Sequence, residues 1–132
     1  MSNRKPPFRA DHVGSLLRPR TIKKARETAG AAKLTEVGFS TNNILQQVED
    51  DAIKRAVALQ EGVGLQAVTD GEYRRSFWHY DFMGALEGLD LVERREAGVQ
   101  FHGVNLRPIF PTITGRLSFP KDHPMLDHFR YL

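Results

Sequence analysis

An amphipathic segment that follows Asn42 constrains the fold more than any other part of the sequence. Apolar residues recur in it at steps of three and four, the spacing of one helix face; they are Ile44, Leu45, Val48, Ala52, Ala56 and Leu59. Ser40, Thr41 and Asn42 offer side-chain oxygens that cap a helix, and Gly62 and Gly64 end it. Such a helix is stable only when another element covers its apolar face.

Two short runs on either side of this helix are typical of buried strands. Residues 8–17, FRADHVGSLL, end in a Gly-Ser turn, and residues 65–72, LQAVTDGE, end in an acidic turn. Between the first run and the long helix, Pro19 starts a short basic helix that stops at Gly30. The order strand, helix, helix, strand favours the start of a parallel α/β sheet.

The rest of the chain has a different pattern. Residues 76–83, SFWHYDFM, favour a short aromatic helix that completes a strand-helix-helix-strand-helix unit over residues 1–85. Residues 89–95, 98–104 and 111–119 read as two or three strands between Gly and Pro turns, which predicts an antiparallel β insertion over residues 86–119. Another helix is expected to begin within residues 120–132, at Asp122-His123-Pro124.

The composition is that of a soluble globular protein, with 40% hydrophobic and 27% charged residues. The first residues, SNRKPPFRAD, are polar and basic, and no run approaches the roughly 18 apolar residues of a membrane span. We therefore expect a cytoplasmic protein with no membrane partner.

Positive charge gathers near the N-terminus. Residues 1–33 hold nine Lys or Arg and two acidic residues, a local charge of +7, so the other 99 residues sum to −4 within the net +3. An anionic ligand such as a phosphate, a polyglutamate tail or RNA is one interpretation. A solvated basic helix face is favoured, because no interleaved aromatics or nucleic-acid motif accompany the run.

The sequence argues against a metal site within this chain. Cysteine is absent, which removes disulfides, thiolate nucleophiles and Cys-containing zinc sites. The five histidines form no HxxxH pair and no HExxH motif.

Two loop tips carry the candidate chemistry: residues 12–15, His-Val-Gly-Ser, and residues 69–72, Thr-Asp-Gly-Glu. Each follows a predicted strand, and in parallel α/β folds these ends converge on the ligand. Gly14 permits a close backbone approach, Ser15 offers donors to a carboxylate, and Glu72 offers a negative charge to an ammonium. Ordinary turns explain either tip alone, and Trp78, Tyr80 and Phe82 suit a core as well as a pocket wall.

The motifs FRADHVGSLLRP and VTDGEYRRSFWHYDF, with the later ITGRL segment, resemble the start of the catalytic barrel of cobalamin-independent methionine synthases. The likeness is closer to the short, single-barrel relatives of 5-methyltetrahydropteroyltriglutamate–homocysteine methyltransferase. It implies that the chain is the N-terminal portion of a (β/α)8 TIM barrel. Because a closed barrel takes about 250 residues, we expect 132 residues to form an incomplete one with exposed edges open to self-association.

The resemblance also implies roles for individual residues. In that family the strand-end Gly-Ser binds the homocysteine carboxylate, which carries over to Gly14 and Ser15, and a loop Glu binds the amino group, which carries over to Glu72. His12 and Val13 are neighbours of the ligand, and Arg75 matches a frequent Arg of the family. The expected substrate-binding set is therefore His12, Val13, Gly14, Ser15, Glu72 and Arg75, with no catalytic or metal-binding residue in this chain.

The family uses Zn²⁺ to hold the thiol as a thiolate, which takes a methyl group from a methylated tetrahydrofolate. Its His-x-Cys pair and later Cys have no counterpart here, so we expect this piece to bind the amino-acid thiol and to be inactive alone. Two alternatives are a non-catalytic binding or assembly module derived from the barrel and a related coenzyme M-type alkyltransferase. The sequence leaves open whether the chain is a natural short protein or a truncation, and which thiol accepts the methyl group.

Overall fold

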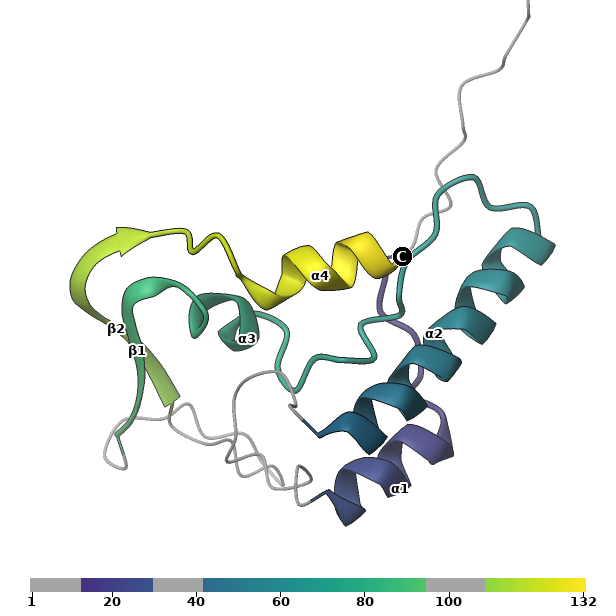
Figure 1. Ribbon diagram of the computed structural model, residues 1–132, viewed down its shortest axis with the longest axis horizontal. Helices are drawn as coiled ribbons and strands as arrows, with labels where there is room; N and C mark the ends of the chain where they lie inside the picture. The colour runs from purple at the N-terminus through teal and green to yellow at the C-terminus, as the bar shows by residue number, and fades with distance from the viewer. Residues whose placement is uncertain (1–12, 30–41, 95–108) are drawn as a thin grey trace, which may run out of the picture.

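The computed structural model describes residues 13–29, 42–94 and 109–132, which form a small mixed α/β unit. Its elements are, in order, α1 (Arg20–Thr28), α2 (Asn43–Gly62), α3 (Tyr80–Met83), β1 (Glu87–Glu93), β2 (Ile109–Ser118) and α4 (Pro124–Tyr131). Helices α1 and α2 lie side by side at one end, the β1–β2 ribbon lies at the other, and α3 and α4 lie between them (Figure 1). Within these ranges no helix combines the length and the apolar character needed to cross a membrane.

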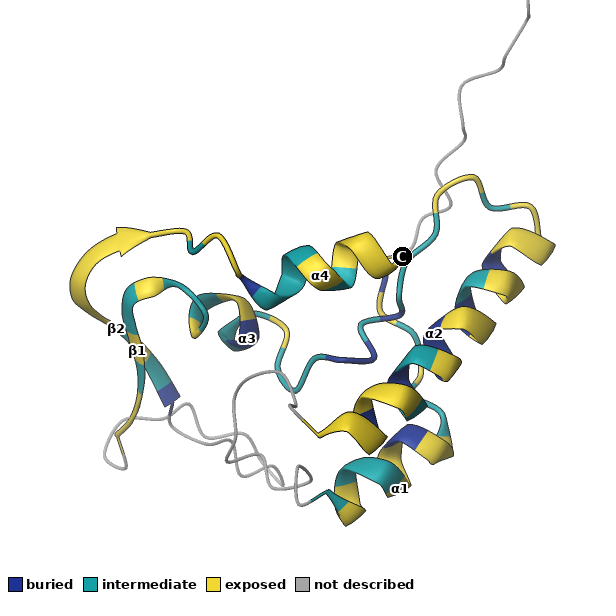
Figure 2. Cartoon of the chain, viewed as in Figure 1, coloured by how far each residue is buried: buried dark blue, intermediate teal, exposed yellow. Residues whose placement is uncertain are grey.

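Helix α2 confirms the predicted amphipathic helix, but its buried face is rotated from the predicted apolar stripe. The Asn42 side chain caps it by accepting a hydrogen bond from the Leu45 amide at 3.0 Å. Ile44 and Leu59 are 72% and 67% exposed, whereas the buried face consists of Leu45, Glu49, Ala52, Ile53, Ala56 and Gln60. Figure 2 shows the buried residues of α2 on the side turned toward the 69–75 segment. Two polar residues therefore lie where the pattern of apolar residues predicted none.

The core forms where α1, α2 and the 69–75 segment meet. It consists of the buried residues Ile22, Ala52, Ile53, Ala56 and Tyr73, with Leu16, Val48 and Val57 packed against it. Tyr73 brings the loop into this core, and its hydroxyl donates to the Leu17 carbonyl at 3.4 Å. Apolar burial thus fixes the second predicted loop tip against both helices.

The strand predicted at residues 65–72 is absent, and this part of the fold prediction is wrong for the described residues. The first predicted strand lies partly outside them, and residues 13–17 form no ladder. Backbone groups of the second segment bond to side chains instead, since both the amide and the carbonyl of Thr69 pair with Gln60. The parallel barrel start remains a prediction.

The antiparallel pairing predicted within residues 86–119 is confirmed for β1 and β2, which pair from Glu93 with Ile109 to Glu87 with Ser118. The third candidate strand, residues 98–104, lies outside the described residues. The short helix predicted at 76–83 is confined to α3, because the Asp81 carboxylate accepts from the Ser76 and Phe77 amides and folds them into a turn.

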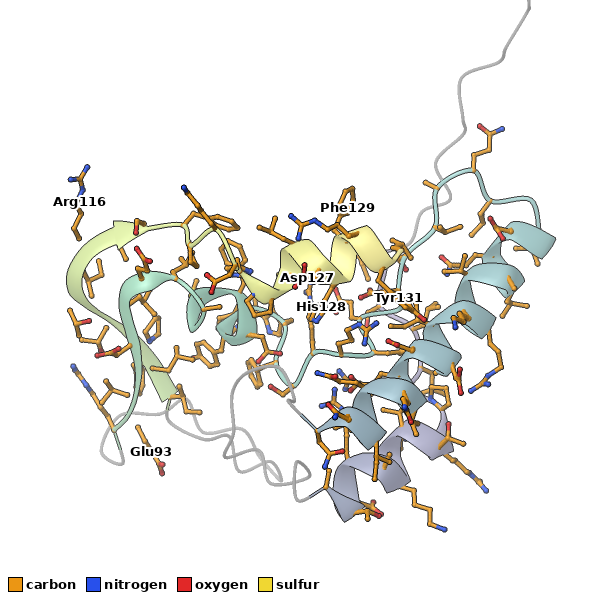
Figure 3. The ribbon with its side chains drawn as sticks, viewed as in Figure 1. Glu93, Arg116, Asp127, His128, Phe129 and Tyr131 are labelled. Atoms are coloured by element: carbon orange, nitrogen blue, oxygen red, sulfur yellow. The ribbon has the colours of Figure 1, made fainter. Side chains whose placement is uncertain are left out.

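Helix α4 begins where the sequence predicts it and is held by hydrogen bonds to α3 and to α2. His123 is fully buried; its Nδ1 accepts from the Met125 amide, so its Nε2 donates to the Phe82 carbonyl, each at 3.2 Å. At the other end, the Tyr131 hydroxyl donates to the Asp50 carbonyl at 3.2 Å. Figure 3 shows Tyr131 on the side of α4 that faces the 70–75 segment, with Phe129 on the opposite side.

Candidate functional site

The two predicted loop tips lie side by side. The Leu16 amide donates to the Gly71 carbonyl at 3.0 Å, and the Thr69 hydroxyl donates to the Gly14 carbonyl at 2.8 Å. Gly14 is buried at φ +91°, and a Cβ there would lie 3.3 Å from the Thr69 methyl group. A larger residue at 14 would therefore push the tips apart. The predicted convergence of the two segments holds even though they do not pair as strands.

Gln60 of α2 sets the position of the second tip. The side chain is 5% exposed, its Nε2 donates to the Thr69 carbonyl at 2.8 Å, and its Oε1 accepts from the Thr69 amide at 3.0 Å. Nε2 also donates to the Ala56 carbonyl at 3.0 Å. The buried side-chain amide of Gln60 thus satisfies both backbone groups of Thr69, which a neighbouring strand would otherwise pair. Sequence reasoning missed Gln60, although its place four residues after Ala56 puts it on the buried face.

The tip itself is a left-handed turn. Gly71 and Glu72 have φ of +68° and +58°. Among the described residues, Glu72 is the one non-glycine residue with a positive φ. The Asp70 carboxylate accepts from the Glu72 amide at 2.9 Å, which is the local hydrogen bond of an Asx turn. A left-handed glutamate costs roughly 1 kcal/mol, so the surrounding contacts must hold it.

Gly71→Ala is expected to lower the free energy of unfolding by about 1–3 kcal/mol. An alanine Cβ would lie 2.9 Å from the Tyr73 ring and 3.1 Å from the Leu16 Cβ, at a φ that side chains disfavour. The matched control is Gly62→Ala, where no atom lies within 4 Å. Urea unfolding of both variants measures the difference, and equal midpoints would contradict the close packing of this turn.

The predicted site residues are placed as follows. His12 lies outside the described residues, and Val13 is 91% exposed. Ser15 is exposed beside the buried Gly14. Arg75 Nη1 donates to Glu72 Oε1 at 3.1 Å and to the Trp78 carbonyl at 3.2 Å, so this guanidinium holds one oxygen of the carboxylate. Among the described residues Glu72 Oε2 accepts no hydrogen bond.

The basic residues of α1 divide between solvent and interior: Arg20, Lys23 and Lys24 are exposed, as the sequence favours, whereas Arg26 is turned inward. Arg26 is largely buried and pairs with Glu49 at 2.8 Å, and Glu49 also lies 3.9 Å from Arg74. Arg74 pairs with Asp50 at 2.5 Å. Burial raises the pKa of Glu49, whereas the charges of Arg26 and Arg74 act to lower it. The sequence shows that these charged residues are present, but it does not show that they pair in the interior. The pairing contacts join residues about 23 positions apart, a separation with no local sequence signal.

Aromatic residues extend from the site toward the ribbon. Phe77 and Tyr80 stack with ring centroids 4.9 Å apart, and the Tyr80 hydroxyl donates to the Ile109 carbonyl at 2.6 Å. Trp78 is 70% exposed. The aromatic segment therefore joins the loop tip to β2, and Trp78 is outside the core.

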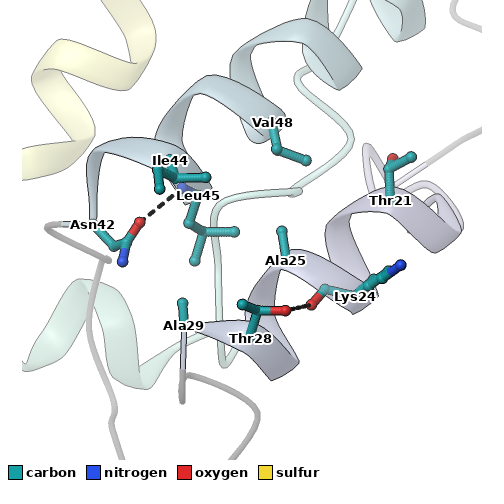
Figure 4. Close-up of a pocket in the computed structure, with 9 residues that line it drawn as sticks. All are labelled: Thr21, Lys24, Ala25, Thr28, Ala29, Asn42, Ile44, Leu45 and Val48. Atoms are coloured by element: carbon teal, nitrogen blue, oxygen red, sulfur yellow. Dashed lines mark hydrogen bonds between the residues drawn. The ribbon is translucent and has the colours of Figure 1, made fainter.

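A cavity of about 360 Å³ lies elsewhere, between α1 and the start of α2 (Figure 4). It is lined by Thr21, Lys24, Ala25, Thr28, Ala29, Asn42, Ile44, Leu45 and Val48. None of these residues belongs to either loop tip. We place the candidate site at the tips, because charged and donor groups converge there while this cavity is mainly apolar.

The described residues contain no group of three His, Cys, Asp or Glu side chains that could hold a metal ion. The zinc ligands of the resembling family include cysteine, which the whole sequence lacks. The described residues therefore offer no group that fits Zn²⁺.

No family model matches the chain. Two curated proteins of Bacillus subtilis (strain 168) are similar: the uncharacterized protein YxjG, 42% identical over 132 residues, and the uncharacterized protein YxjH, 43% identical over 129 residues. The alignments cover 100% and 98% of this chain but 33% and 32% of those proteins, so the chain spans about a third of the length of the curated relatives it matches.

A solved structure is also similar: the crystal structure of a candidate vitamin-B12-independent methionine synthase from Listeria monocytogenes, with a TM-score of 0.66 and 34% identity. The match covers 98% of this chain and 32% of that one. The resemblance to methionine synthases seen in the sequence is thus supported by a solved protein of that description, over about a third of its length.

Proposed function

We propose that this chain forms the amino-acid-binding part of a methyltransferase related to vitamin-B12-independent methionine synthases. The observation that carries the proposal is the contact between the loop tips, since Ser15 and Glu72 each adjoin a residue that joins the tips. The likeness to the Listeria protein supports the same reaction class, transfer of a methyl group to a thiol in methionine biosynthesis.

The charges at the tips suit the two ends of a free amino acid. Glu72 Oε2 is open to an ammonium, and the adjacent Arg75 holds the other carboxylate oxygen in place. The exposed Ser15 offers a hydroxyl to the ligand carboxylate, and Gly14 lets the backbone approach it. Val13 and His12 complete the proposed contacts at the first tip. Homocysteine is the substrate that this assignment predicts, with a methylated tetrahydrofolate as donor.

The residues of this chain position the substrate in this proposal and do not activate its sulfur. The described residues do not fit Zn²⁺, so no step is assigned to a metal held by them. Accordingly, we expect the chain by itself to bind the amino acid without methylating it.

Titration calorimetry of the protein with two ligands tests the proposal. L-Homocysteine and 4-mercaptobutyrate differ only in the amino group, so a Glu72–ammonium pair predicts at least about tenfold tighter binding of L-homocysteine. Equal affinities would remove Glu72 from the site.

A second candidate is a binding or assembly module without catalysis. Large apolar side chains are unusually exposed on several elements: Leu17 by 88%, Ile44 by 72% and Phe129 by 79%. Such surfaces suit association with a further protein surface or with a second copy. Size-exclusion chromatography with light scattering separates the candidates, because this one predicts a soluble, defined oligomer, whereas aggregation of the chain favours part of an enzyme.

A further inference from the structure

Four consecutive carbonyl groups, those of residues 72–75, are each held by an arginine from the N-terminal part of the chain. Arg18 Nη2 donates to the Glu72 carbonyl at 3.2 Å and also to the Arg75 carbonyl. Arg26 Nη2 donates to the Tyr73 and Arg74 carbonyls at 2.9 and 2.8 Å. The Glu72 carbonyl also accepts from the Arg75 amide at 3.3 Å, so two guanidinium groups and one backbone amide satisfy these four carbonyls.

The two arginines differ in what balances their charge. Arg26 pairs with Glu49, whereas among the described residues no carboxylate lies within ion-pair distance of Arg18. The Nε of Arg18 is buried without a partner. Burial and the neighbouring charge of Arg26 lower the pKa of Arg18, while the more distant charges of Glu49, Asp81 and Glu72 act to raise it. The carbonyls of Glu72 and Arg75 therefore accept the hydrogen bonds that hold this guanidinium, and the carboxylates act on it only from beyond ion-pair distance.

These contacts act on Glu72 and Arg75 together. The Glu72 amide is held by Asp70 and its carbonyl by Arg18 and the Arg75 amide, so the peptide groups on both sides of this left-handed residue are fixed. Arg18 also donates to the carbonyl of Arg75, whose side chain contacts the Glu72 carboxylate. One guanidinium thus contacts the backbone of both members of the half-buried Glu72–Arg75 pair.

We propose that Arg18 is a positioning residue: by holding the carbonyls of residues 72 and 75, it keeps Glu72 left-handed and aims its carboxylate. The clamp rests on these contacts alone, and its effect on an amino-acid ligand rests on the proposed function.

The clamp is tested without any ligand by amide hydrogen exchange read by mass spectrometry. The variants are Arg18→Met, which removes the donors, and Arg18→Lys, which keeps the charge but reaches fewer carbonyls. Arg20→Met is the control, because Arg20 is exposed on α1. We expect peptides across residues 70–76 to exchange about tenfold faster in Arg18→Met, which corresponds to about 1.4 kcal/mol, and less so in Arg18→Lys. Peptides from α2 report that the fold is kept. Unchanged exchange at 70–76 overturns the proposal, as does equal acceleration in both segments.

Binding separates positioning from simple stabilisation. Arg18→Met is expected to weaken L-homocysteine binding about tenfold and to leave 4-mercaptobutyrate, which lacks the ammonium, unchanged. Equal losses for the two ligands overturn an action through Glu72. If the unaltered protein itself fails to distinguish the ligands, the proposed function is wrong, and hydrogen exchange still decides the clamp.

Discussion

Glu72→Gln is expected to weaken L-homocysteine binding about 30-fold, or roughly 2 kcal/mol, the low end for loss of one partner of a buried charge pair. The low end applies because the Glu72 side chain is 25% exposed. Glutamine has the same shape and its oxygen can still accept from Arg75, so the turn should persist while the charge that attracts the ammonium is lost. Calorimetric titration of the variant measures the change.

Two comparisons make this result specific. Glu61→Gln removes an equal charge from an exposed position near the end of α2 and is expected to leave the affinity unchanged. Binding of 4-mercaptobutyrate to Glu72→Gln should also match that of the unaltered protein, since that ligand has no ammonium. Undiminished L-homocysteine affinity in Glu72→Gln would exclude an ammonium-binding role for Glu72.

The features that could be predicted are those with local signals. Helix α2 follows from its three- and four-residue spacing, and its start follows from Asn42, whose side chain bonds three residues ahead. The antiparallel ribbon follows from short apolar runs between turns. The nearness of Gly14 to the second tip was predicted from an expected parallel sheet, and it holds through different contacts.

The features that could not be predicted depend on polar side chains that bond to distant backbone. Gln60 and Glu49 lie on the buried face of α2, where the sequence pattern reserves positions for apolar residues. Arg18 contacts a carbonyl 54 residues away, a pairing that no local period encodes. The same bonds explain the missing strand, because the Thr69 amide and carbonyl are already taken by Gln60. Where side chains satisfy the backbone, propensity for a strand no longer decides the local structure.

Arg26→Met is expected to have the largest effect on stability, a loss of about 3–5 kcal/mol in the free energy of unfolding, as for other broken buried ion pairs. Glu49 is 2% exposed, and its remaining partner, Arg74, is 3.9 Å away. The Tyr73 and Arg74 carbonyls would lose their donor as well. Lys23→Met, on the exposed side of α1, is the control and should change stability little.

The loss in Arg26→Met should depend on pH in a definite direction. Burial already raises the pKa of Glu49 above its ordinary 4.5, and the Arg26 charge and hydrogen bond hold that pKa down. Without Arg26 the folded-state pKa rises further, so between 4.5 and that value the folded chain binds a proton that the unfolded chain has lost. Stability then falls as pH rises through this window, and the variant should be less impaired at pH 5 than at pH 8.

A second substitution tests whether the unpaired Glu49 carboxylate causes the loss of stability in Arg26→Met. In Arg26→Met with Glu49→Leu, the uncompensated charge is gone, so most of the lost stability should return and its pH dependence should flatten. Recovery should stay incomplete, because the carbonyls of Tyr73 and Arg74 still lack their donor. Thermal unfolding of the single and double variants at both pH values measures this. If the double variant is no more stable than Arg26→Met, Arg26 acts through the carbonyls of Tyr73 and Arg74 rather than through Glu49, and those two hydrogen bonds contribute the larger share of the stability.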